Sequence, residues 1–98
     1  MSKSDKDLVV ERVQTGMRME KRMVKVLKAL AEYLDISLGD LLEGIVLHAF
    51  EDQSPFSAQT LQQIARLKEV YGMDYGLEAS HHLKESSPAR KEGESNAL

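Results

Sequence analysis

The chain has 98 residues, of which 42% are hydrophobic and 30% are charged, which suits a single small folded domain with short tails. It contains no cysteine, and this excludes disulfides, thiol catalysis and cysteine-based metal sites. No apolar run approaches the roughly 20 residues that a membrane-spanning helix needs, and residues 1–7 lack the apolar stretch of a signal peptide. We therefore expect a cytoplasmic protein with no membrane partner.

The formal net charge of −3 conceals an uneven distribution along the chain. Between Arg12 and Lys28 there are six basic residues and a single acidic one, Glu20. From Asp35 onward, eleven acidic residues outnumber five basic ones. A basic segment joined to an acidic remainder indicates an anionic partner for that one part of the chain.

The stretch Val13–Met19 alternates between two kinds of side chain. One parity is mostly apolar (Val13, Thr15, Met17 and Met19) and the other is polar or small (Gln14, Gly16 and Arg18). This period of two predicts a strand with one buried face. Because a lone strand leaves its backbone groups unpaired, we expect it to pair with the same strand of a second copy in a homodimer. The alternative is a monomeric three-helix bundle with a frayed N-terminal arm.

Three helices are expected after this stretch. Apolar residues at helical spacing predict the first helix over Glu20–Leu34. Ser37 as N-cap, with Asp40 three residues later, predicts the start of a second helix that continues to Phe50. A third helix is expected from an N-cap at Ser57 to a C-cap at Gly72.

The order of strand, helix, short connector and helix, with basic residues near the strand, resembles the ribbon-helix-helix family, which includes the Arc and methionine repressors. The resemblance covers about Arg12–Glu51. It implies an intertwined homodimer whose two-stranded antiparallel ribbon lies in the major groove of double-stranded DNA. It also implies that the start of the second helix is held against a phosphate.

Residue roles follow from this resemblance together with the chemistry of the groups. Arg18 can pair with guanine and Gln14 with adenine, whereas Gly16 departs from the family pattern, which usually has a polar residue there. The expected base-reading residues are Gln14, Gly16 and Arg18. The expected phosphate-binding residues are Arg12, Lys21, Arg22, Lys25, Ser37, Leu38 and Gly39. The expected dimer core consists of Val13, Thr15, Met17, Met19, Leu27, Leu41 and Ile45.

The expected fold is mainly α with one short strand, a ribbon-helix-helix with an additional C-terminal helix. Residues 1–10 would form a flexible arm, 11–52 the DNA-binding and dimerisation domain, 53–83 a C-terminal helical extension and 84–98 a disordered tail. The boundary of the extension lies at the turn Glu51–Pro55, and the tail is rich in Ser, Glu, Lys and Gly.

The expected function is sequence-specific DNA binding by a transcriptional regulator, a repressor. One alternative is an antitoxin whose C-terminal segment binds a toxin, which would make the C-terminal helix a site for a protein partner. Another is a helical adaptor with no DNA role, which the acidic isoelectric point of 5.6 favours. We expect no enzyme activity, no metal and no cofactor, because the histidines (His48, His81 and His82) form no ligand or catalytic pattern and there is no phosphate-binding glycine loop.

Overall fold

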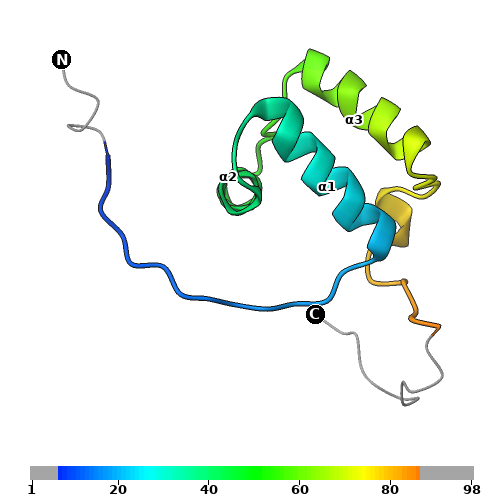
Figure 1. Ribbon diagram of the computed structural model, residues 1–98, viewed down its shortest axis with the longest axis horizontal. Coiled ribbons are helices and arrows are strands. Elements are labelled where there is room, and N and C mark those ends of the chain that lie inside the picture. The colour runs from blue at the N-terminus through cyan, green and yellow to red at the C-terminus, as the bar shows by residue number, and fades with distance from the viewer. Residues whose placement is uncertain (1–6, 87–98) are drawn as a thin grey trace.

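The computed structural model describes residues 7–86, which contain three α-helices and one short 3₁₀ turn (Figure 1). The helices are α1 (Lys21–Leu34), α2 (Leu38–Phe50) and α3 (Ala58–Val70), and the turn is η2 (Leu77–Ala79). The prediction of a mainly α chain is therefore confirmed. The expected disordered tail falls mostly on residues 87–98, which lie outside the described residues, as do residues 1–6 of the expected arm.

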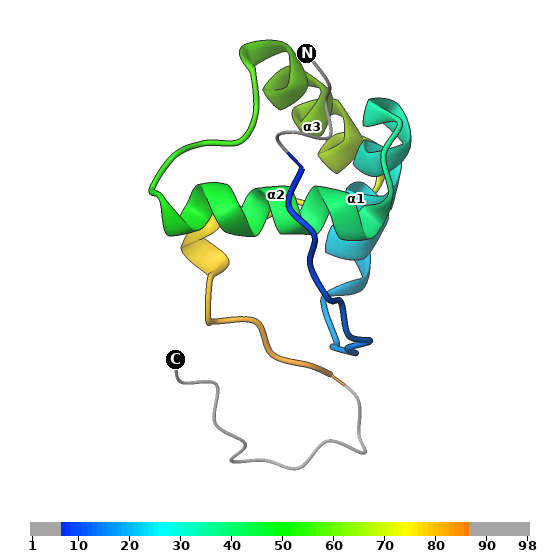
Figure 2. The ribbon, with the colours of Figure 1, turned by 90° about the vertical axis from the view of Figure 1, so that its left-hand side faces the viewer.

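Residues 7–86 contain no β-strand, so the predicted strand at Val13–Met19 is wrong, and so is the ribbon-helix-helix fold built on it. Residues 7–19 instead form an irregular arm that leaves the start of α1 and passes across α2 (Figures 1 and 2). Alternating side chains can share a face only if the backbone is a strand, and a strand needs a neighbour that supplies hydrogen-bond partners. The chain offers the arm no such neighbour within residues 7–86, and Gly16 lowers its strand propensity further. The three helices with a separate N-terminal arm match the alternative arrangement.

Local side-chain contacts determine where the helices begin and end. The Ser37 Oγ accepts a hydrogen bond from the backbone N–H of Asp40 at 3.0 Å, which confirms the predicted cap of α2. The Ser57 Oγ accepts in the same way from the N–H of Thr60 at 3.1 Å and caps α3. The left-handed conformation of Asp35 ends α1 and turns the chain into α2.

The core lies where α2 and α3 each pack on α1. Its buried side chains are Val26, Leu30, Ala31 and Leu41. A shell of partly buried residues packs against the cluster around Leu30, and consists of Leu27, Leu34, Leu38, Ile45, Phe56, Ile64 and Leu67. Four buried side chains make a small core for a folded unit of about 70 residues, a size at which a single core rarely supplies enough stability.

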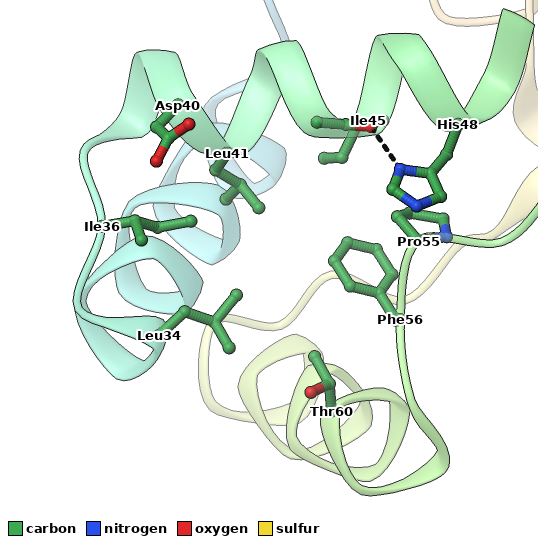
Figure 3. A pocket seen from close by; sticks show the side chains of 10 residues that line it. Leu34, Ile36, Asp40, Leu41, Ile45, His48, Pro55, Phe56 and Thr60 are labelled. Carbon is green, nitrogen blue, oxygen red and sulfur yellow. Dashed lines mark hydrogen bonds between the residues drawn. The ribbon is translucent and has the colours of Figure 1, made fainter. Parts of the chain in front are cut away.

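The backbones of α2 and α3 do not come close to each other, and a shallow groove of about 280 Å³ lies between the inner face of α2 and the chain that enters α3. Phe56 points into this space opposite Leu41 and Ile45 (Figure 3). At its rim, the Nδ1–H of His48 donates to the carbonyl of Gly44 at 2.7 Å. The groove is smaller than the roughly 300–1,000 Å³ of a typical ligand pocket, so we interpret it as a gap in helix packing. No helix between residues 7 and 86 has both the length and the apolar character that crossing a membrane requires.

Candidate nucleic-acid interface

Most of the predicted DNA-contacting side chains lie in the arm and in the first two turns of α1. Lys21, Lys25 and Lys28 are spaced by four and three residues, so they form one row along the helix, and all three are exposed. Arg18 precedes this row in the arm and is also exposed. These side chains come from one continuous stretch of chain around the start of α1. We define the basic end of the molecule as Arg18, Lys21, Arg22, Lys25 and Lys28.

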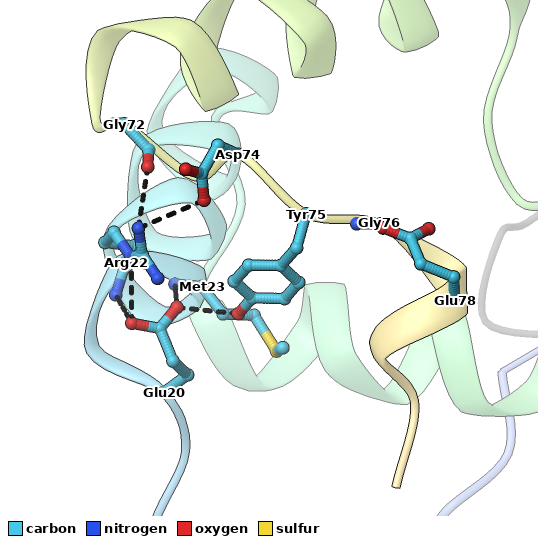
Figure 4. A network of polar contacts seen from close by, with 8 residues as sticks. All are labelled: Glu20, Arg22, Met23, Gly72, Asp74, Tyr75, Gly76 and Glu78. Carbon is cyan, nitrogen blue, oxygen red and sulfur yellow. Dashed lines mark hydrogen bonds and ion pairs between the residues drawn. The ribbon is translucent and has the colours of Figure 1, made fainter. Parts of the chain in front are cut away.

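Glu20 is the acidic residue within this stretch, and its carboxylate is directed into the protein rather than along the basic row. It caps α1 by accepting the backbone N–H groups of Arg22 and Met23 at 3.1 and 3.2 Å. It also accepts the Nε–H of Arg22 at 3.1 Å and the hydroxyl of Tyr75 at 2.6 Å (Figure 4). Four donors therefore converge on this one carboxylate.

The same network fastens the chain after α3 to the start of α1. The Nη1 of Arg22 donates to the carbonyl of Gly72 at 2.9 Å and to the carboxylate of Asp74 at 3.3 Å. Its guanidinium also lies over the ring of Tyr75, 5.5 Å from the ring centroid. Arg22, which the sequence suggested as a phosphate ligand, is thus engaged within its own chain.

These contacts change the proton affinities of Glu20 and Tyr75. Partial burial would raise the pKa of the Glu20 carboxyl, but the hydrogen bonds from Tyr75, Arg22 and Met23 outweigh it and lower this pKa from 4.5 to about 2. Burial, and then the hydrogen bond to the Glu20 carboxylate, raise the pKa of Tyr75 from 10.0 to about 12. At neutral pH Glu20 is therefore ionised and Tyr75 keeps the proton that it donates.

Other basic side chains in this region are paired as well. Arg12 forms a two-pronged ion pair with Glu43 of α2, at 2.9 and 2.8 Å, which places the arm beside that helix. The hydrogen bond from Arg12 lowers the pKa of Glu43. Arg18 pairs with Glu85, and the Nζ of Lys25 lies 5.9 Å from the centroid of the Tyr71 ring. The two ion pairs join largely exposed side chains, a setting in which such pairs add little stability.

The predicted phosphate-binding residues form two separate groups in one protomer. Lys21, Arg22 and Lys25 stand at the start of α1, whereas Ser37, Leu38 and Gly39 stand at the start of α2. The seventh, Arg12, lies apart from both groups in the arm, where it pairs with Glu43. The 14 residues of α1 separate the two groups by about 20 Å along the helix axis.

The predicted dimer core is divided in a similar way. Its arm residues are exposed, with Val13 at 82% and Met17 at 69%, while Leu41 is buried inside the protomer and Leu27 and Ile45 pack beside it. The predicted base-reading residues (Gln14, Gly16 and Arg18) all lie exposed on the arm.

Sequence reasoning assigned no contact or capping role to Glu20, Asp74 or Tyr75. An acidic residue directly before the apolar stripe of a helix is a signal for an N-cap, and it could have identified Glu20. Asp74 and Tyr75 lie more than 50 residues from their partners Arg22 and Glu20, and nothing local in the sequence indicates such contacts.

No known family model matches this chain, and neither the curated proteins nor the solved structures include one that is significantly similar to it. The function is therefore argued from its residues and their contacts.

Proposed function

We propose that this chain is a sequence-specific DNA-binding protein that regulates transcription as a homodimer. The observation that carries the proposal is the basic end, which concentrates positive charge in a chain that is acidic overall. The acidic residue within it, Glu20, is turned toward Arg22 and Tyr75 and does not pair with the exposed lysines. A row of lysines of this kind suits the phosphate backbone of a duplex, whose neutralisation dominates the affinity of proteins for DNA.

The arm supplies groups that could add sequence preference. Gln14 and Arg18 carry the amide and guanidinium groups that recognise adenine and guanine edges in the major groove. Both are exposed on an arm that has no regular secondary structure, and the arm leads directly into the row of lysines. Phosphate contacts from α1 would then position the arm, and the arm would contact the bases.

The homodimer is supported by the outer face of α2. Val46, Leu47 and Phe50 are exposed there, with Leu47 at 63% and Phe50 at 78%. Glu43, one turn earlier on the same face, already pairs with Arg12, and residues 44–50 carry no acidic, lysine or arginine side chain, so this part of the face fits an apolar partner. A second copy of α2 would cover it in a two-fold symmetric contact, in which the same patch serves both protomers. That contact would also add buried area to a core that is small for one protomer.

The contacts of the C-terminal half favour a regulator over an antitoxin. An antitoxin segment needs a surface that is free to bind the toxin. Here Ile64 and Leu67 of α3 pack against the core on α1, and Gly72 and Tyr75 are bonded to residues at the start of that helix. The helix α3 therefore already has a partner within its own chain.

The experiment that tests DNA binding compares two charge reversals of equal size. Lys21→Glu lies in the basic end, and Arg66→Glu lies on the exposed surface of α3. Fragments selected from genomic DNA by the wild-type protein serve as the labelled probe in fluorescence anisotropy. We expect Lys21→Glu to weaken binding about tenfold or more, with a much smaller loss for Arg66→Glu.

The salt dependence of binding is a second measurement on the wild-type protein. If a dimer makes about six phosphate contacts, log affinity should fall against log salt with a slope near −5. Equal losses, or a flat salt response, would support the adaptor alternative.

The homodimer is tested separately by sedimentation equilibrium. Leu47→Lys places a charge on the outer face of α2, and Leu61→Lys places the same charge on α3, where Leu61 is also exposed. We expect the first variant to be a monomer and the second to remain a dimer. A wild-type monomer, or a Leu47→Lys dimer, would contradict the assignment of this interface.

A further inference from the structure

The chain that follows α3 makes a series of contacts with the basic end. We define the C-terminal cover as residues 71–85. Its Asp74 bonds to Arg22, its Glu85 pairs with Arg18, and its Tyr71 and Tyr75 place their rings beside Lys25 and Arg22. Three of the five basic-end residues are thus in contact with this one segment.

We propose that the C-terminal cover is an autoinhibitory segment that occupies the DNA-binding surface of its own chain and is displaced when DNA binds. The inference rests on the proposed function, because it concerns the regulation of that same site. A carboxylate binds a guanidinium through the same charge-assisted hydrogen bonds that a phosphate uses. Asp74 and Glu85 therefore stand in for two phosphates of a duplex.

The ion pairs of Asp74 and Glu85 are weak enough to be displaced, whereas the half-buried Tyr75 is held more firmly by its bond to Glu20. Asp74 is 84% exposed, and no residue between 71 and 86 is buried. The regular structure in the cover is the three-residue turn η2. Ion pairs between exposed groups contribute little and are screened by salt. By contrast, α3 is packed on α1 through apolar side chains and would stay in place.

The hydrogen bond between Tyr75 and Glu20 fixes the position of the C-terminal cover on the basic end. It positions the Tyr75 ring against the guanidinium of Arg22, and the Arg22 bonds to Gly72 and Asp74 lie beside it (Figure 4). The other nearby acid, Glu78, accepts instead from the backbone of Gly76 at 2.9 Å within the cover itself. The competing acids are therefore Asp74 and Glu85.

If DNA binds only to molecules whose C-terminal cover is displaced, its apparent association constant is the intrinsic one multiplied by the fraction of such molecules. Weakening the cover should therefore strengthen DNA binding, although no DNA-contacting residue has changed. This result would not follow if residues 71–85 only stabilised the fold.

The test uses the full chain and the double variant Asp74→Asn/Glu85→Gln, which removes two charges and keeps the side-chain shapes. The matched control is Glu51→Gln/Asp52→Asn, which removes the same charge from exposed residues in the turn after α2. DNA affinity is measured by anisotropy with the selected fragments, and hydrogen exchange of residues 72–80 is followed in the wild-type protein with and without DNA. We expect the cover variant to bind about three to ten times more tightly than the control, and the exchange of residues 72–80 to rise when DNA binds.

Equal affinity of the cover variant and the control would overturn the autoinhibitory cover and leave DNA binding intact. Exchange of residues 72–80 that stays the same or slows on adding DNA would do the same, because a displaced segment must lose protection. If none of the proteins binds DNA at low salt, both the cover and the proposed function fail.

Discussion

Replacing Glu20 by glutamine should destabilise the fold at neutral pH, and the effect should disappear in acid. The Glu20 carboxylate accepts four hydrogen bonds, two from the first turn of α1, one from the Arg22 side chain and one from Tyr75. Glutamine keeps one acceptor oxygen but loses the negative charge and the second oxygen. The substitution therefore weakens the cap of α1 and the fastening of the C-terminal segment together.

The size of the effect follows from the lowered pKa of Glu20. A change from 4.5 to about 2 corresponds to roughly 3 kcal/mol in favour of the folded, ionised form. The side chain remains 22% exposed, so solvent reduces this, and we expect about 2 kcal/mol. Because the folded-state pKa is lowered, this contribution is fully present above pH 4.5 and is lost as the pH falls from there to about 2.

The measurement is urea unfolding followed by helical circular dichroism at several pH values between 7 and 2.5. Wild-type protein and Glu20→Gln should differ by about 2 kcal/mol in the free energy of unfolding at pH 7 and converge toward pH 2. Glu32→Gln, an exposed substitution on α1, serves as the control and should follow the wild type. A difference between wild type and Glu20→Gln that is the same at every pH would refute the reasoning, because the charge would then not be what stabilises the fold.

Three further substitutions test local features of the fold by the same unfolding assay. Ser37→Ala removes the cap of α2 and should cost about 1 kcal/mol, and a loss near zero would show that the Ser37 Oγ bond does not matter. Leu30→Ala empties the most buried position, which is 2% exposed, and should cost about 3 kcal/mol; a loss below 1 kcal/mol would mean that the core collapses around the gap. Gly72→Ala places a side chain at a φ of 68° and should cost about 1 kcal/mol, so an unchanged stability would contradict the need for glycine there.

Features that depend on neighbouring residues could be predicted from the sequence. The caps at Ser37 and Ser57 need only an oxygen three residues before a free N–H, so the local pattern was sufficient. The apolar stripe of α1 was equally local, and its Val26, Leu30 and Ala31 are the buried residues of that helix.

Features that depend on distant residues could not be predicted. Val13–Met19 has the alternation of a strand, but a strand also needs a hydrogen-bonding neighbour, and residues 7–86 provide none. The charge of Arg22 could be read from the sequence, whereas its partners Gly72 and Asp74 lie 50 and 52 residues away. The charges of the candidate site could therefore be read from the sequence, whereas the pairing among its side chains could not.

Substituting alanine for Gly44 tests which side of α2 faces a second copy. A Cβ at this position meets nothing within 4 Å, and glycine inside a helix costs about 1 kcal/mol relative to alanine. At about 100° per residue, Gly44 points more than 100° away from Val46 and Phe50 and about 60° away from Leu47, so it lies at the edge of the outer face and not at its centre. Gly44→Ala should therefore raise the free energy of unfolding by about 1 kcal/mol and leave the dimer dissociation constant unchanged. A more stable protomer that dimerises more weakly would show that the second helices cross at Gly44, because only a close backbone approach makes one methyl group an obstacle.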